Sequence, residues 1–431
     1  MNQKSVVPQI ISLANSAITE QEQISQAMSA SFRLRRLINT GDLVFLLADD
    51  AVNAYEKLLE QLLQQERWQE KYSVEYLGKA IQRIIATLLK EEQTAELAGR
   101  LFDQLKSEFD TFSKEYVIYT PLEGISLLTD SFPMGKIIFR KMTDAYINDL
   151  FGRIKAITLL TLSPVGAKEA SISWTKQRID SLRGTVCAEF SICAEPQRAR
   201  ERAEEEVRHI LDTLRYAISV LYSRNFNIAV GLQGEVVSAI RIIPTLALDE
   251  QSYELPSSCV GPLQPFTFSS ENIQKMEQIG IFKIAEILKH PDQTTDFEKT
   301  LLRGIHWFAT SQTQFEKEND FLNLMTCLET FLTSSGATFI GPSLANQVAE
   351  GVARLLAIEL EDRKALKKRI QKLYGVRSGT SHGGQKTILE TELADLRSIA
   401  KQLIFQMIQR KDEFPTHKAL LDWLDEQRLV G

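Results

Sequence analysis

A helical repeat of apolar residues in the last third of the chain is the pattern that most limits its fold. Between residues 387 and 410, apolar side chains recur every three or four positions, which is the spacing of one face of an α-helix. Such a face is stable only when it is buried against another element. From about residue 271 onward the sequence therefore predicts a bundle of four or five helices. The same spacing predicts its other helices at about 297–318, 320–333, 346–359 and 362–376.

Two regions with other patterns precede this bundle. Residues 1–110 show helical periodicity, as in the leucine stripe from Leu58 to Leu63, and predict a small helical module. Residues 111–270 combine one charged helix at about 196–223 with short β-type segments, and the proline-rich stretch 255–265 is the best linker. Strands are expected at 116–119, 121–124, 136–140, 174–179, 185–193, 236–248 and 266–268. The predicted class is α+β, mainly α, with domains at 1–110, 111–270 and 271–431.

Composition places the chain among ordinary soluble globular proteins. Its 431 residues are too many for one compact core, and 44% hydrophobic with 25% charged residues is a typical balance. The longest clean apolar run near the N-terminus, residues 43–48, is far too short to span a membrane, and no signal-peptide pattern opens the chain. We therefore expect a cytoplasmic protein without membrane contact. The four cysteines include no Cys-x2-Cys pair and have no histidine at ligand spacing, so neither a metal nor another cofactor is predicted.

One stretch, residues 373–384, places an arginine and a histidine between two predicted helices. Arg377 keeps its positive charge at any physiological pH and can hold a phosphate, while His382 can take or give a proton near neutrality. RNA cleavage without a metal needs these two abilities. Two other Arg-x6-His spacings exist, but one lies within a charged helix and the other spans a proline.

The geometry expected of this stretch depends on where the preceding helix ends. Five residues of unbroken α-helix turn through about 500°, which would leave the two side chains about 140° apart and unable to share one phosphate. Gly379 and the pair at 383–384 permit the chain to leave helical geometry. We therefore expect the helix to end near Val376 and the chain to fold His382 back toward Arg377. The alternative for His382 is an ordinary turn histidine.

Basic side chains mark the helix that leads into this stretch. Lys364, Lys368 and Lys372 recur at every fourth position with Arg369 beside them, and positions 361–377 carry seven basic and two acidic residues. In a protein of net charge −6, any RNA contact must come from such a local patch, and these side chains are its predicted contacts with an RNA backbone. The alternative is a solvated helix face.

Glu329 is the acidic residue that borders the apolar stripe of the helix predicted at 320–333. A carboxylate in that position needs a partner, and Arg377 or a neighbouring basic group is expected to supply it. Such a pair has two possible roles: it orients a catalytic arginine, or it only holds two helices together.

Three segments taken together, residues 301–307, 321–332 and 373–384, resemble the Apea-like branch of the HEPN superfamily. The resemblance spans about residues 296–412. It implies a helical bundle that dimerises, so that the Arg-x4-6-His motifs of two subunits surround one cleft. Many members are metal-independent ribonucleases of toxin and anti-phage defence systems, and others are non-catalytic binding modules.

The resemblance also implies roles for individual residues. Arg377 and His382 match the motif, and Glu329 matches the acidic position of the family's Leu-Glu helix segment. Tyr374 and Ser378 are its supporting neighbours, although many active members have Asn, Asp or His where this chain has Ser378. The implied reaction is attack of the ribose 2′-hydroxyl on phosphorus, with His382 moving a proton and Arg377 stabilising charge on the phosphoryl oxygens.

These observations lead to one expected function and two alternatives. A single histidine per chain cannot easily be both acid and base in one step, so the chemistry also favours a homodimer. We expect a regulated endoribonuclease that acts on RNA, with residues 1–270 as a sensor or scaffold for a protein or nucleic-acid trigger. The alternatives are a non-catalytic RNA- or nucleotide-binding module and a dimerising interaction protein.

Overall fold

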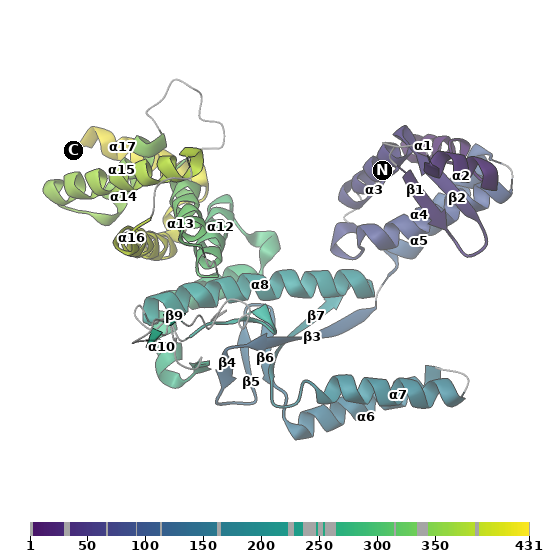
Figure 1. Cartoon of the computed structure of the whole chain (residues 1–431), viewed down its shortest axis with the longest axis horizontal. Helices are drawn as coiled ribbons and strands as arrows, with labels where there is room; N and C mark the ends of the chain where they lie inside the picture. The colour runs from purple at the N-terminus through teal and green to yellow at the C-terminus, as the bar shows by residue number, and fades with distance from the viewer. Residues whose placement is uncertain are drawn as a thin grey trace. The chain divides into compact units, whose positions relative to one another are not determined.

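The computed structural model resolves the chain into two compact units (Figure 1). The first unit is Met1–Ile118 with Ser191–Glu204, and the second is Tyr119–Phe190 with Glu205–Gly431. Helices predominate over strands, so the predicted α+β, mainly α class is confirmed. The structure describes residues 3–29, 35–65, 68–91, 93–112, 114–161, 165–222, 228–235, 247–248, 253–254, 264–313, 316–333, 344–383 and 388–430.

The first unit packs helices around one β-hairpin. Phe45, Leu46 and Leu47 on the second strand are fully buried, and so is the predicted leucine stripe of the following helix. The predicted small helical module is interrupted by this hairpin, which the sequence did not indicate because a five-residue apolar run suits a strand and a buried helix equally well. The elements are α1 (Gln3–Asn15), α2 (Gln21–Ser29), β1 (Arg35–Asn39), β2 (Val44–Ala48), α3 (Asp50–Gln65), α4 (Val74–Lys90) and α5 (Ala95–Asp110).

The second segment of this unit contributes the beginning of a long helix, α8 (Pro196–Leu221), which confirms the charged helix predicted there. The buried carboxylate of Glu195 caps it by accepting hydrogen bonds from the backbone N–H groups of Gln197, at 2.8 Å, and Arg198, at 2.7 Å. The same carboxylate accepts from the backbone N–H of Ser73 at 3.2 Å. Since Ser73 is the N-cap of α4, one side chain ties the start of α8 to the start of α4.

The middle of the chain builds a five-stranded sheet in the order β5-β6-β7-β3-β8. β5 and β6 form an antiparallel hairpin whose turn places Gly135 at a φ of 63°, a conformation that favours glycine. A separate parallel pair joins β4 to β11. The strands are β3 (Glu115–Glu123), β4 (Ile125–Leu127), β5 (Ser131–Met134), β6 (Ile137–Lys141), β7 (Val186–Cys193), β8 (Gly231–Leu232), β9 (Ala247–Leu248), β10 (Tyr253–Glu254) and β11 (Phe266–Phe268).

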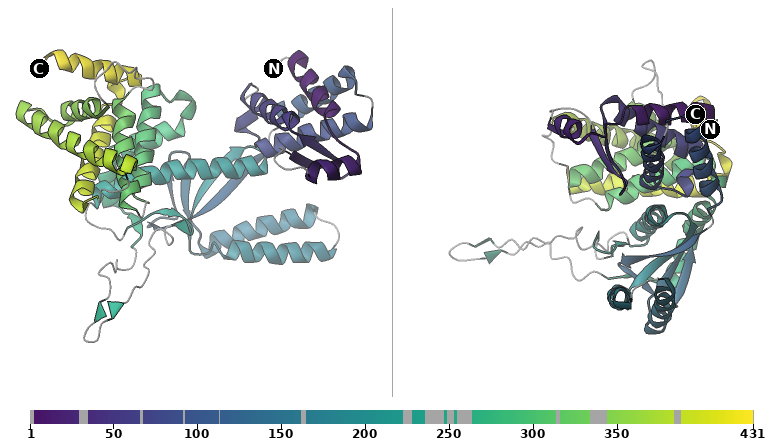
Figure 2. Two further views of the ribbon diagram at one scale, coloured as in Figure 1. Left: turned by 45° about the horizontal axis from the view of Figure 1, so that its top comes forward. Right: turned by 90° about the vertical axis from the view of Figure 1, so that its right-hand side faces the viewer.

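Most of the strands expected in this region are present, and one is wrong. The predictions at 136–140, 185–193 and 266–268 match β6, β7 and β11, and the two strands expected at 116–119 and 121–124 are one continuous strand, β3. Residues 174–179, expected as a strand, are instead helical and belong to α7 (Val165–Asp180), which lies beside α6 (Asp144–Thr161) in Figures 1 and 2. Trp174 is largely exposed there. Residues 236–246 and most of the linker at 255–265 lie outside the described residues.

Beyond residue 269 the described residues are mainly helical, as predicted. α12 begins at a capping box in which Thr295 and Glu298 bond each other's backbone N–H groups, and it ends at Ser311 rather than near 318. α15 differs more, because it continues seven residues past Val376. The helices are α10 (Ser270–Gln278), α11 (Ile281–Lys289), α12 (Asp296–Ser311), α13 (Lys317–Leu332), α14 (Leu344–Leu356), α15 (Leu360–Gly383), α16 (Glu390–Gln409) and α17 (His417–Val430).

Candidate functional site

α13 and α15 bring together three of the residues singled out from the sequence. Tyr374 and Arg377 are three positions apart on α15, so both reach the same face of the helix, where Glu329 of α13 meets them. The Tyr374 hydroxyl donates a hydrogen bond to Oε1 of Glu329. Nη2 of Arg377 lies 3.2 Å from Oε1 and 3.3 Å from Oε2 of the same carboxylate. The expected pairing of Glu329 with Arg377 is therefore present.

In the triad of Glu329, Tyr374 and Arg377, the arginine side chain is bound by Glu329 and is also partly exposed to solvent. The side chains of Glu329 and Arg377 are 16% and 31% exposed, and Tyr374 is buried. Burial, reinforced by the hydrogen bond to Glu329, raises the pKa of Tyr374 above its ordinary value, so the phenol stays a donor. Within the described part of the chain, the buried Nε of Arg377 has no hydrogen-bond partner. Glu329 thus orients the guanidinium and balances its charge while part of the group remains solvent-accessible.

The expected turn after Val376 is absent. α15 runs without interruption to Gly383, so Arg377 and His382 stand on one continuous helix. Their positions are about 140° apart around the axis and about 7.5 Å apart along it. The prediction that Gly379 lets His382 fold back is wrong, because glycine in a helix interior costs only about 1 kcal/mol and permits a break without forcing one. The side chains of Ser378 and His382 lie outside the described residues.

The basic face of α15 is partly engaged in ion pairs. Lys364 Nζ lies 2.8 Å from Oε1 of Glu361 on the same helix, and Arg369 pairs with Asp395 of α16. Lys368 and Lys372 are exposed and make no ion pair with any residue that the structure describes. Of the four side chains predicted to contact RNA, Lys368 and Lys372 are therefore the two without an ion pair among the described residues, and the contacts with RNA stay a prediction.

A second cluster, which the sequence did not indicate, joins α8 to α12. Nδ1 of His306 lies 2.8 Å from Oδ2 of the buried Asp212, and Nη1 of Arg215 lies 3.1 Å from Oδ1. The hydrogen bond to Asp212 raises the pKa of His306, although partial burial opposes this. His306 belongs to one of the three resembling segments, but its partner is 94 positions away along the chain. No local pattern could have paired them.

Two further features bear on the expected cofactors and membrane contact. Within the described ranges, no three His, Cys, Asp or Glu side chains gather so that they could hold a metal ion. None of the helices in the same ranges combines the length and the apolar run that a membrane crossing requires.

Comparisons with known proteins do not extend these observations. Protein-family models, curated proteins and solved structures all gave no match to this chain. The resemblance to the Apea-like branch of the HEPN superfamily therefore stays a prediction that rests on residues 301–307, 321–332 and 373–384.

Proposed function

We propose that the C-terminal helices cleave RNA without a metal ion, as a regulated endoribonuclease of toxin or defence type. The observation that supports this most is the triad of Glu329, Tyr374 and Arg377, which holds a permanent cation in a defined orientation at the start of the Arg-x4-His motif. A guanidinium held in this way can stabilise the charge that develops on phosphoryl oxygens during cleavage.

The continuous course of α15 shapes this proposal. One helix separates Arg377 and His382 too widely for both to reach one phosphate, so the proposed active site takes the arginine from one copy and the histidine from a second copy. The 2′-oxygen attacks phosphorus and loses its proton to this histidine, and the bond from phosphorus to the 5′-oxygen breaks as that oxygen gains a proton from water. The products are a 2′,3′-cyclic phosphate and a free 5′-hydroxyl.

The direct test is cleavage of labelled RNA by full-length protein in the presence of EDTA. His382→Ala and Arg377→Lys should both abolish cleavage, while His290→Ala, at an exposed histidine of the same unit, should not. Lysine at 377 keeps the charge beside Glu329 but loses the planar fork that binds phosphate, so the fold is retained. Equal cleavage by all four proteins, or products that end in a linear 3′-phosphate without a cyclic precursor, would refute the proposal.

Mixing two inactive variants tests the shared site separately. When Arg377→Lys and His382→Ala chains are combined in equal amounts and exchange subunits at random, half of the dimers contain one chain of each kind. In each of these dimers one of the two sites has both Arg377 and His382. We expect about a quarter of the wild-type rate from this count of sites. No recovery, from variants shown to exchange subunits, would contradict an active site shared between copies.

A second candidate is RNA binding without cleavage. It is favoured by the unbroken α15, which presents Lys368 and Lys372 to solvent without ion pairs among the described residues. Reversing both charges to glutamate should then weaken RNA binding and lower its salt dependence, because fewer counterions are released. The matched control reverses two exposed lysines elsewhere in the unit, Lys155 and Lys299, and should leave binding nearly unchanged.

A further inference from the structure

The hairpin of the first unit has one open edge. β1 pairs with β2, and no other strand among the described residues joins its far side. Thr40 donates its backbone N–H to Leu43 at 3.0 Å, and the pairing alternates from there, so the N–H and C=O groups of Leu37 and Asn39 point away from β2. The hydrogen bonds of β2 agree with this alternation. Leu46, which lies opposite Leu37, forms both of its backbone hydrogen bonds with Ile18 rather than with β1.

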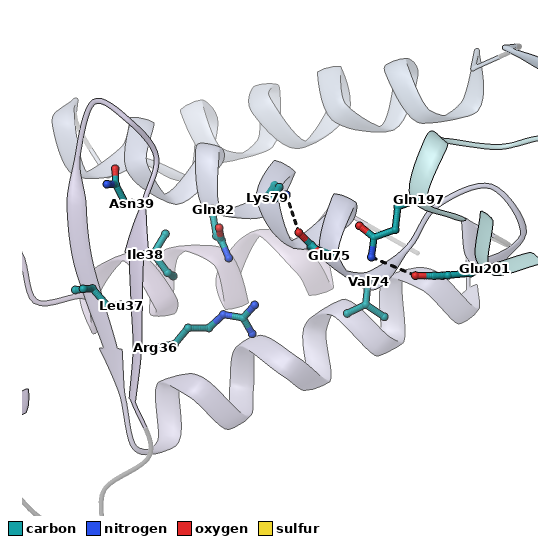
Figure 3. Close-up of a pocket in the computed structure, with 10 residues that line it drawn as sticks. All are labelled: Arg36, Leu37, Ile38, Asn39, Val74, Glu75, Lys79, Gln82, Gln197 and Glu201. Atoms are coloured by element: carbon teal, nitrogen blue, oxygen red, sulfur yellow. Dashed lines mark hydrogen bonds and ion pairs between the residues drawn. The ribbon is translucent and has the colours of Figure 1, made fainter. Parts of the chain in front are cut away.

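A cavity of about 640 Å³ opens along this edge (Figure 3). Four consecutive residues of β1, from Arg36 to Asn39, line one side of it, and residues of α4 and the first turns of α8 line the other. Successive side chains of a strand point to opposite faces, so four in a row border one cavity only when the cavity follows the strand edge. The outward N–H and C=O groups of Leu37 and Asn39 therefore face this space.

Among the charged side chains that line the cavity, Arg36 makes no ion pair within the described part of the chain. Glu75 lies 2.7 Å from Nζ of Lys79, and Glu201 lies 3.1 Å from Nη1 of Arg198, so both carboxylates are paired. Arg36 stacks on the ring of Tyr55, with its guanidinium carbon 5.1 Å from the ring centroid, and has no ion pair or hydrogen bond with any described residue. In Figure 3 its side chain extends from β1 toward α4.

Apolar side chains at the rim complete the character of the site. Leu37 is 51% exposed and Val74 is 55% exposed, although both are large and hydrophobic. The cavity thus combines two backbone donors, two backbone acceptors, two exposed apolar groups and a guanidinium that makes no ion pair with the residues the structure describes. An extended peptide presents the matching features: alternating N–H and C=O groups along its edge, apolar side chains, and a carboxylate where the sequence supplies one.

We propose that the free edge of β1 binds an extended segment of a partner protein that carries an aspartate or glutamate. The segment adds to the hairpin as a third strand, and its backbone forms hydrogen bonds with Leu37 and Asn39. Its carboxylate accepts two parallel hydrogen bonds from the guanidinium of Arg36. Binding by edge addition also covers backbone groups that an exposed edge strand otherwise leaves open to unspecific association.

The test measures fluorescence anisotropy of labelled heptapeptides that alternate valine and threonine around a central aspartate, with the full-length protein. Two further peptides carry asparagine or lysine at the centre. Two more keep the aspartate but are N-methylated on alternate residues, one along each edge, so that each lacks the donors of a single edge. We expect saturable binding of the aspartate peptide, weaker binding of the asparagine and lysine peptides, and loss of binding for only one of the N-methylated pair.

Protein variants test the same contacts from the other side. Arg36→Gln should weaken binding of the aspartate peptide by about tenfold and of the asparagine peptide hardly at all. Arg83→Gln, at an exposed position of α4 outside the cavity, is the matched control and should change neither. Val74→Glu places a carboxylate beside the bound one and should also weaken binding by about tenfold. An acidic residue is favourable in the first turn of a helix, so this second variant keeps the fold.

Several results would overturn the proposal. These are the absence of saturable binding to any of the peptides, equal affinity for the aspartate and lysine peptides, and equal binding of both N-methylated peptides. A short RNA could also displace the bound peptide. If binding of that RNA is lost in Arg36→Gln, the cavity belongs to nucleic acid. Self-association of the protein that is abolished by Val74→Glu would assign the edge to a second copy of the chain.

Discussion

Replacing Gly304 of α12 with alanine tests how closely that helix packs on α13. A Cβ atom at position 304 would lie 2.1 Å from Cζ and 2.4 Å from Cε2 of Phe331. Ordinary van der Waals contact begins at 3.4 Å, so the ring would have to retreat by about 1.3 Å. Phe331 is fully buried, and no open space receives the displaced ring without moving its neighbours.

Two opposing effects set the size of the change. Alanine is favoured over glycine in a helix interior by about 1 kcal/mol, whereas overpacking a rigid core costs about 1–3 kcal/mol. The clash involves an edge of the ring rather than one atom, so the upper part of that range applies, and we expect a net destabilisation of about 1–2 kcal/mol. Gly375 of α15 is the matched control, since nothing lies within 4 Å of a Cβ built there. Gly375→Ala should stabilise its helix by up to about 1 kcal/mol.

Hydrogen exchange of the amides in α12, α13 and α15 measures these changes locally, which matters because two compact units can unfold in separate steps. We expect faster exchange in α12 and α13 of Gly304→Ala and slower exchange in α15 of Gly375→Ala. Adding Phe331→Leu to Gly304→Ala makes room for the methyl group and should restore part of the protection. If Gly304→Ala exchanges as slowly as the wild type, the ring yields without cost and the reasoning fails.

Two other substitutions follow from the buried polar contacts. Glu329→Ala leaves the Tyr374 hydroxyl and the Arg377 guanidinium without their acceptor and should destabilise α15 by about 2–3 kcal/mol. Glu329→Gln keeps one acceptor and should cost less. Similar hydrogen exchange in both variants and the wild type would contradict this. The pKa of His306 is raised by its bond to Asp212, so the charged pair stabilises the fold below the ordinary histidine value of 6.5, and this contribution is lost as the pH rises through the folded-state pKa. The melting temperature should therefore fall between pH 6 and pH 9 by more in the wild type than in His306→Gln, and parallel curves would refute the link.

Long periodic segments of this chain could be predicted, and short ones could not. The apolar spacing of α13 and α16 extends over about three or more turns, a length that strands rarely reach, so both helices lie close to their expected bounds. The same spacing put Glu329 at the border of the buried face, where a carboxylate requires a cation, and Arg377 meets it. By contrast, the segments at 44–48 and 174–179 have only five and six residues, a length that suits either a strand or part of a helix, and only tertiary packing decides between them.

The end of α15 shows a different limit. Gly379 and the serine and threonine residues around it weaken a helix by a few tenths of a kcal/mol to about 1 kcal/mol each, and a continuous helix still offsets these costs with one backbone hydrogen bond per residue. Sequence signals of this size indicate where a helix can end, but they do not fix where it does end. The contacts that position Arg377 are long-range, whereas the expected position of His382 depended entirely on a local break.

Because α15 is continuous, the two proposed functions should depend differently on protein concentration. RNA binding by Lys368 and Lys372 needs one copy of α15, so the fraction of RNA bound should follow a simple saturation curve. Cleavage that takes Arg377 from one copy and His382 from another needs two copies, so its rate should rise with the square of the concentration below the dissociation constant of the dimer. A cleavage rate that stays linear in concentration throughout the monomeric range would mean that a single copy cleaves RNA, and it would refute the site shared between copies.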